Sequence, residues 1–139
     1  KNRPKGFRPR PVAMSIPKKL SLIHTDVGVN LVDSGVGLRL IDWQCPAVGD
    51  ICEDIYSFLS PAFQILGERP QLSDEQIKSF WDTLNRPDLA YRYSKLCAAF
   101  AWRFAGYCAW RAEILDDSDI CKRYRGALSA ELKYLEDFI

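Results

Sequence analysis

The sequence predicts a mainly α-helical domain that carries one small β-hairpin near its beginning. Its 139 residues are enough for one domain with a core of its own. A hydrophobic fraction of 47% and an aromatic fraction of 12% indicate a packed globule rather than a disordered chain. After residue 50, apolar residues recur at the three- and four-residue spacing of amphipathic helices, whereas strand-like alternation is confined to residues 30–43.

Residues 1–19 are expected to form a basic, proline-rich linker. This segment carries seven Lys or Arg residues, four prolines and no acid, whereas the rest of the chain holds 12 basic and 18 acidic residues. Prolines at this density disfavour a helix and favour an extended chain. A basic segment can also bind nucleic acid, but no series of aromatic residues accompanies the charge, so nucleic acid is not expected as a partner.

Two short strands are predicted at residues 30–32 and 36–41, joined by a turn at residues 33–35 with the sequence Asp-Ser-Gly. In the second strand Leu38, Leu40 and Trp43 alternate with polar residues, which is the pattern of a half-buried strand. A hairpin of this size is only marginally stable alone. We therefore expect it to pack on the helices.

The first helix is expected to begin at Asp50, which is a good N-cap and is followed by Glu53 at the spacing of a capping box. Pro61 should break or kink this helix, because its ring clashes with the preceding turn. A second helix should open at Ser73, where Gln76 completes a similar box.

Pro87 fits the first turn of a third helix. Between residues 96 and 115 this helix is apolar almost all round, so we expect it in the centre of a helical bundle. Its charged residues argue against a membrane span. Asp116, Asp117 and Ser118 offer caps for a last helix.

The cysteines favour a reducing compartment. They are five in number, widely spaced and without a CxxC pair, and the chain has one histidine, so a zinc site is not expected. With no signal peptide and no apolar run of 18 residues, the sequence predicts a cytoplasmic protein outside the membrane. Because the chain begins with Lys rather than Met, it is expected to be a piece of a longer protein.

Residues 22–54 hold the one dense group of polar residues with chemical potential, namely His24, Asp26, Asn30, Asp42, Asp50 and Asp54. Their order is H-x-D, an Asn, a hairpin, I-D-W and then G-D-x-x-x-D. This order resembles the aminoglycoside phosphotransferase and choline kinase family, a branch of the protein-kinase-like fold. The likeness covers residues 20–66 well and the later helices only in general character.

The resemblance implies that residues 20–139 are the C-terminal lobe of such a kinase. It divides them into a catalytic loop at residues 22–30, a metal-loop hairpin at 31–43 and a helical bundle at 50–139. The lobe would take part in transferring the γ-phosphate of ATP to a hydroxyl group of a small molecule, with Mg²⁺ as the cofactor. Such transfer needs an oriented hydroxyl and cations that neutralise the phosphates.

The resemblance also assigns roles to single residues. Asp26 is in the position of the carboxylate that accepts or orients the hydroxyl proton, and Asn30 and Asp42 are in the positions of the two Mg²⁺ ligands. His24 would brace the loop. A turn cap is the alternative role for Asp42 and for Asp26, but a carboxylate buried between Ile41 and Trp43 without a partner would be costly, which favours a metal ligand.

Asp50 and Asp54 match the family's G-D-x-x-x-D segment, which supports the catalytic loop from behind. Helix capping is their alternative role, and the two roles are compatible. Neither residue is therefore expected to be catalytic.

The chain departs from the family pattern in two places. The family usually has four residues between the base Asp and the Asn, whereas three separate Asp26 from Asn30. Either Gly28 allows an unusual backbone path that restores the geometry, or Asn30 is misplaced and the site is weakened. The family also usually has a glycine between the His and the Asp, where this chain has Thr25.

The sequence contains no glycine-rich phosphate loop and no strand lysine of the kinase type. The N-terminal lobe that carries them would precede residue 1, so this chain alone should bind ATP poorly. A catalytically impaired or truncated fragment with a binding or structural role remains the alternative.

Two groups of residues in the sequence could contact a substrate, and each also has a structural interpretation. Trp102, Tyr107 and Trp110 offer either a cage for a quaternary ammonium group or ordinary packing residues. Acids at positions 116, 117 and 119 offer either attraction for a cationic substrate or a helix start. In both cases the structural interpretation is favoured.

Overall fold

The computed structural model describes residue 17 and residues 19–138, and most of the predicted linker lies outside them. The described chain is mainly helical, as predicted, with short antiparallel strands near its beginning. The elements are β1 (Ser21–Ile23), α1 (Val27–Asn30), β2 (Leu31–Asp33), β3 (Leu38–Leu40), β4 (Ala47–Gly49), α2 (Ile51–Leu59), α3 (Pro61–Leu66), α4 (Asp74–Leu84), α5 (Pro87–Ile114) and α6 (Ser118–Glu136).

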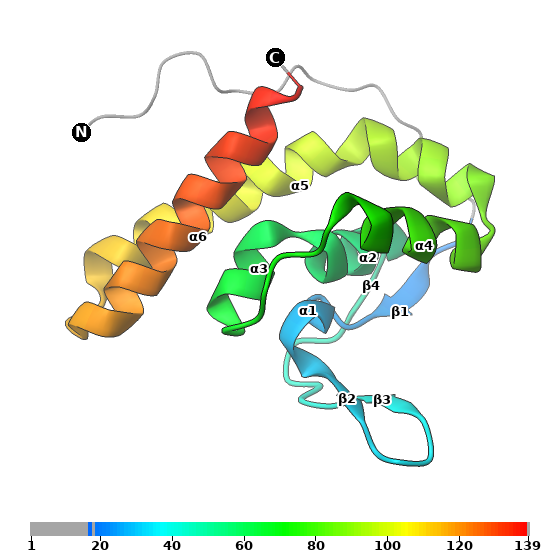
Figure 1. The fold of residues 1–139 in the computed structure, drawn as a ribbon, viewed down its shortest axis with the longest axis horizontal. Coiled ribbons are helices and arrows are strands. Elements are labelled where there is room, and N and C mark those ends of the chain that lie inside the picture. Colours follow the sequence, from blue (N-terminus) through cyan, green and yellow to red (C-terminus); the bar gives the residue numbers. More distant parts are fainter. Residues whose placement is uncertain (1–16, 18, 139) are drawn as a thin grey trace.

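The helices build one core, in which α5 packs on α2 and α6, and α6 also packs on α3 (Figure 1). Tyr56 and Phe63 lie at its centre, together with Cys97 and Ala101 of α5 and Leu135 of α6. Four of the five cysteines are buried, as expected of reduced thiols that act as small hydrophobic residues.

Most helix ends follow the sequence prediction. Asp50 caps α2, and Ser73 and Gln76 form the capping box of α4. Pro61 ends α2 and occupies the first turn of α3, because a proline lacks the N–H that an interior helical position needs. Pro87 does the same for α5. The predicted box at the start of α2 is absent, since the Glu53 carboxylate pairs with Arg103 of α5 instead.

The strands form two separate two-stranded sheets. The pair β2 and β3 is the predicted hairpin, with Leu31 opposite Leu40. The pair β1 and β4 was not predicted; it places Leu22 opposite Val48 and brings the two ends of residues 22–48 together at the helical body.

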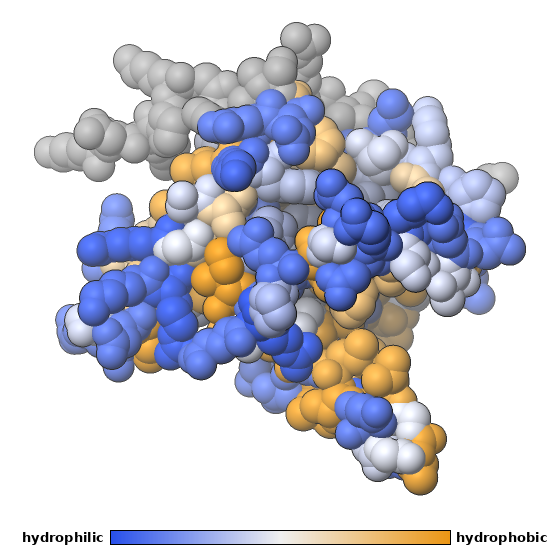
Figure 2. All heavy atoms as spheres, viewed as in Figure 1, coloured by the Kyte–Doolittle hydropathy of each residue, from blue (hydrophilic) through white to orange (hydrophobic). Residues whose placement is uncertain are grey.

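The expectation that the hairpin packs on the helices is wrong. It projects away from the helical body (Figure 1), with Leu38 70% and Val36 85% exposed. In Figure 2 its apolar side chains form an exposed patch at one end of the molecule. No helix in the described chain covers these side chains. The apolar face that the alternating sequence pattern of the hairpin predicted is therefore exposed.

The expectation that residues 96–115 lie in the centre of a helical bundle holds for only part of α5. Its first half lies in the core. In its second half Phe104 and Cys108 still pack against α3 and α6, but Tyr107, Trp110 and Ile114 are exposed. Within the described part of the chain, no helix combines the length and apolar character needed to cross a membrane.

Candidate functional site

The loop before α1 is held by a carboxylate from α2. Asp54 accepts hydrogen bonds from the backbone N–H groups of His24 and Thr25, at 2.9 and 2.8 Å. Hydrogen bonds to an ionised acceptor are stronger than neutral ones. Asp54 therefore supports the loop from behind, as predicted.

His24 has a structural role and joins the loop to the hairpin. Its side chain is 1% exposed and lies edge-on to Trp43, at a ring separation of 4.6 Å. Nδ1 accepts the backbone N–H of Asp26 at 3.3 Å, so Nε2 carries the proton and donates it to the carbonyl of Ile41 at 2.7 Å. With both nitrogens engaged, His24 is a brace, as predicted.

The segment from Asp26 to Asn30, expected to be a loop, contains the helical turn α1. Two residues that sequence reasoning missed hold its ends. The hydroxyl of Ser57 accepts the first N–H, from Val27, at 3.0 Å, and Arg69 donates to the carbonyls of Gly28 and Val29. Ser57 lies three residues after Asp54 on α2, a spacing that places both on one face. Nothing in the sequence points to Arg69.

Gly28 is required by a close approach and not by an unusual backbone path. A Cβ atom at this position would lie 2.4 Å from the carbonyl oxygen of Ser57 and 2.9 Å from Cβ of Phe63. Its φ is outside the left-handed region, and α1 is an ordinary turn. The expected role of Gly28 is therefore corrected: it lets α1 pack directly on α2 and α3.

The three residues predicted for chemistry come together at α1. The Asn30 side chain donates to the carbonyl of Asp26 at 2.9 Å, and the Asn30 carbonyl accepts from the backbone N–H of Ile41 at 2.9 Å. The second bond extends the hairpin ladder by one pair and brings Asp42 beside the end of α1. Burial raises the pKa of Asp26, and the charge of Asp42 raises it further, whereas His24 and Asn30 lower it.

Thr25 and Asp42 have left-handed backbones, with φ of 70° and 59°. Residues other than glycine adopt this region at a cost and are often found at functional sites. Asp42 is exposed, as are Ile41 and Trp43, so the expectation of a buried carboxylate is wrong. Among the hydrogen bonds of the described residues, none involves the Asp42 carboxylate, so no turn cap by Asp42 is seen there.

Asp50 does not support the loop, contrary to expectation. One carboxylate oxygen accepts the N–H of Cys52 at 3.1 Å, and the other pairs with Arg92 of α5 at 2.6 Å. Burial acts to raise the pKa of Asp50, but the hydrogen bonds from Arg92 and Cys52 outweigh burial and lower it. Asp50 thus fixes α2 to α5.

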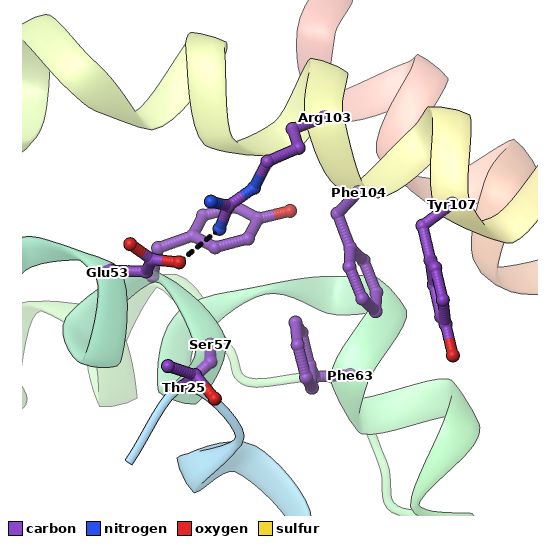
Figure 3. A pocket seen from close by; sticks show the side chains of 8 residues that line it. Thr25, Glu53, Ser57, Phe63, Arg103, Phe104 and Tyr107 are labelled. Carbon is purple, nitrogen blue, oxygen red and sulfur yellow. Dashed lines mark hydrogen bonds and ion pairs between the residues drawn. The ribbon is translucent and has the colours of Figure 1, made fainter. Parts of the chain in front are cut away.

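A cavity of about 260 Å³ opens beside Thr25 (Figure 3). One wall consists of aromatic rings, with Phe63 stacked on Phe104 at 4.1 Å and Tyr107 next to them. The facing wall carries the ion pair between Glu53 and Arg103. The cavity thus combines apolar rings and a carboxylate next to the loop that carries Asp26.

The aromatic set proposed from sequence does not form a cage. Trp102 packs against the core, Trp110 is exposed, and only Tyr107 lines the cavity. The acidic residues at the start of α6 have the simpler role that was favoured: Asp117 caps the helix, and Asp119 in its first turn pairs with Lys122.

Replacing Asp54 is expected to destabilise the loop that its carboxylate holds. Asp54→Ala leaves the N–H groups of His24 and Thr25 without their acceptor, at an expected loss of about 2–4 kcal/mol in the free energy of unfolding. Asp54→Asn keeps one acceptor oxygen and should lose less. Denaturant unfolding measures both, with the exposed Asp82→Ala as control; equal stability of Asp54→Ala and the control would contradict the bracing role.

Comparison with known proteins gives no match: no family model, no curated protein and no solved structure is similar enough to this chain to place it in a family. The function must therefore be argued from the site itself.

Proposed function

We propose that the chain is the C-terminal lobe of a phosphotransferase that moves the γ-phosphate of ATP to a hydroxyl group of a small molecule. Asp26 accepts or orients the hydroxyl proton, and Asp42 and Asn30 hold Mg²⁺. The observation that carries this proposal is the meeting of these three residues around α1, through the hydrogen bonds from Asn30 to Asp26 and from Ile41 to Asn30.

The shortened run between Asp26 and Asn30 is compatible with this role. One helical turn places these residues four apart on the same side, and the amide nitrogen of Asn30 is used by the Asp26 carbonyl. The amide oxygen then remains for a cation. The left-handed backbone of Thr25 also supports the resemblance, because the family usually has glycine at this position and glycine favours that conformation.

The donor set suits Mg²⁺. Asp26 and Asp42 repel each other, and the Asp42 carboxylate has no hydrogen-bond partner among the described residues. When bound, the ion would neutralise charge on the phosphates. The described residues include no cluster of three or more acidic, His or Cys side chains that could hold a metal unaided. Phosphate oxygens and water would therefore have to complete the coordination of the ion.

A second lobe is part of the proposal. Leu22 and Val48 of the small sheet are 65% and 71% exposed, and they add to the uncovered apolar face of the hairpin. An exposed apolar surface of this kind usually marks an interaction site. We propose that it packs against a lobe that supplies the phosphate-binding loop and lysine.

The cavity beside Thr25 is the proposed acceptor pocket. Its aromatic wall and the Glu53 carboxylate suit an alcohol that also carries a cationic amine, which is the class implied by the resemblance. Such an acceptor would replace Arg103 as the partner of Glu53.

The proposal is tested by metal and nucleotide binding to the protein in the presence of both lobes. Asp42→Asn should weaken Mg²⁺–ATP binding at least about tenfold in titration calorimetry, because it removes a charged ligand from the cation. Asp33→Asn is the matched control on the same hairpin, since Asp33 only accepts a turn hydrogen bond from Gly35. Absence of Mg²⁺–ATP binding at millimolar nucleotide would instead favour a non-catalytic relative with a binding or structural role.

A further inference from the structure

Glu131 of α6 is completely buried at the start of α3. Its Oε1 accepts a hydrogen bond from the hydroxyl of Ser60 and a longer one, at 3.4 Å, from the backbone N–H of Ala62. The carboxyl group thus caps the first turn of a helix that lies about seventy positions earlier in the chain. This contact ties α6 to the junction between α2 and α3.

Two polar atoms next to this junction are buried without a hydrogen-bond partner among the described residues. They are the second oxygen of Glu131, Oε2, and the hydroxyl of Tyr56, which is itself only 2% exposed. Buried polar atoms are nearly always hydrogen-bonded, because burial without a partner forfeits the hydrogen bonds to water and gives none in return. Two such atoms in one cluster require a common explanation.

Among the residues that the structure describes, no positively charged group acts on Glu131. The titratable groups that face it are Tyr56 from α2 and Tyr93 and Cys108 from α5, and α3 contributes the neutral Ser60 and Ala62. None of the ion pairs formed by the described residues involves Glu131. A buried carboxylate with no counter-charge is strongly disfavoured against its neutral form.

We propose that Glu131 is protonated in the folded protein and that its Oε2–H donates to the hydroxyl oxygen of Tyr56. One proton then satisfies both orphaned atoms and removes the unpaired charge. Burial raises the pKa of Glu131 above its usual 4.5, which outweighs the lowering that hydrogen bonds from Ser60, Tyr56 and Ala62 to the ionised carboxylate would give. The carboxyl–phenol pair joins α6 to α2 in the middle of the core.

The pair makes this contact between α6 and α2 sensitive to a rise in pH. Above pH 4.5 the folded protein holds one proton more than the unfolded chain, so the folding equilibrium constant falls about tenfold per pH unit until the pH passes the raised pKa. Because Tyr56 also lines the cavity beside Thr25, ionisation of Glu131 would also affect the lining of that cavity. The inference itself does not depend on the proposed phosphotransfer.

The proton is detected by infrared spectroscopy. Glutamate labelled with ¹³C at the carboxyl carbon should show a protonated C=O band at neutral pH, and among the described glutamates Glu131 is the one that is buried. The band should vanish in Glu131→Gln and remain in Glu136→Gln, the same change at an exposed position of α6. It should shift in Tyr56→Phe, which removes the acceptor. Absence of the band would overturn the proposal, and an unshifted band in Tyr56→Phe would overturn the role of Tyr56.

Unfolding as a function of pH gives an independent test. Glu131→Gln keeps the shape and can donate an amide N–H to Tyr56, so its stability should lose the decline that begins above pH 4.5 and should exceed that of the parent once the pH passes the raised pKa. Glu136→Gln should retain the decline. The same pH dependence in all three proteins would show that Glu131 is ionised in the fold and would contradict the inference.

Discussion

Replacement of Asp26 by asparagine is expected to reduce phosphate transfer about 10²- to 10⁴-fold, which is the range for loss of a positioned acid–base group. Asparagine keeps the size of the side chain but cannot accept the hydroxyl proton. The measurement is ADP release with Mg²⁺–ATP and a panel of amino alcohols, on the protein in the presence of both lobes. Retained turnover would remove Asp26 from the mechanism.

The same substitution should not weaken the fold. The pKa of Asp26 is raised, so ionising this residue opposes folding, and stability contributed by its neutral form is lost as the pH rises above 3.8. Asp26→Asn removes that loss and should be at least as stable as the parent at neutral pH. The exposed Asp82→Asn is the control for both measurements. An unfolded Asp26→Asn would show instead that this residue is needed for structure.

The raised pKa also predicts the direction of the pH profile. The proposed transfer requires the ionised carboxylate of Asp26, so we expect activity to fall on acidification at a higher pH than an ordinary aspartate would cause. Binding of Mg²⁺ beside Asp42 should offset the repulsion between the two carboxylates and move this fall to lower pH.

Gly28→Ala is expected to lose about 3 kcal/mol of stability, at the upper end of the usual range for overpacking. The added methyl group would meet the carbonyl oxygen of Ser57 at 2.4 Å and Cβ of Phe63 at 2.9 Å. Neither atom is the end of a flexible side chain, so α1 must move as a unit. Displacement of α1 carries Asn30 with it, and Mg²⁺–ATP binding should weaken in parallel.

Gly106→Ala is the matched control for this change. Gly106 lies on the exposed side of α5, and a Cβ atom there has nothing within 4 Å. Alanine is preferred over glycine inside a helix, so this variant should gain about 0.5–1 kcal/mol. Denaturant unfolding compares the two. Similar stability of both variants would mean that α1 does not pack on α2 as closely as described.

Features that depend on neighbouring residues could be predicted from the sequence. Asp50, Ser73 and Asp117 cap helices because their side chains reach backbone N–H groups two or three positions away. The prolines at positions 61 and 87 start helices through their own missing N–H. The support of the loop by Asp54 was expected for a different reason, since the family resemblance implied it.

Features that join distant parts of the chain could not be predicted in this way. Ser57 reaches Val27 across 30 positions, Arg69 reaches Gly28 across 41 and Glu131 reaches Ser60 across 71. The pairing of β1 with β4 and the exposure of the hairpin also depend on what surrounds each segment. The order of Asp26, Asn30 and Asp42 suggested a site, but only the fold shows that they meet.

The two halves of the proposed site are attached to the molecule differently. Asp26 is anchored to the helical body, because Asp54 and Ser57 of α2 hold the backbone on either side of it. Asp42 follows the projecting hairpin, and its two neighbours contact the loop, Ile41 through hydrogen bonds with His24 and Asn30 and Trp43 through the His24 ring. A force on the hairpin would reach Asp42 through these contacts, whereas Asp26 is held to α2. A partner bound to the hairpin would therefore affect the distance between Asp26 and the proposed metal ligand Asp42, and with it the activity of the proposed site.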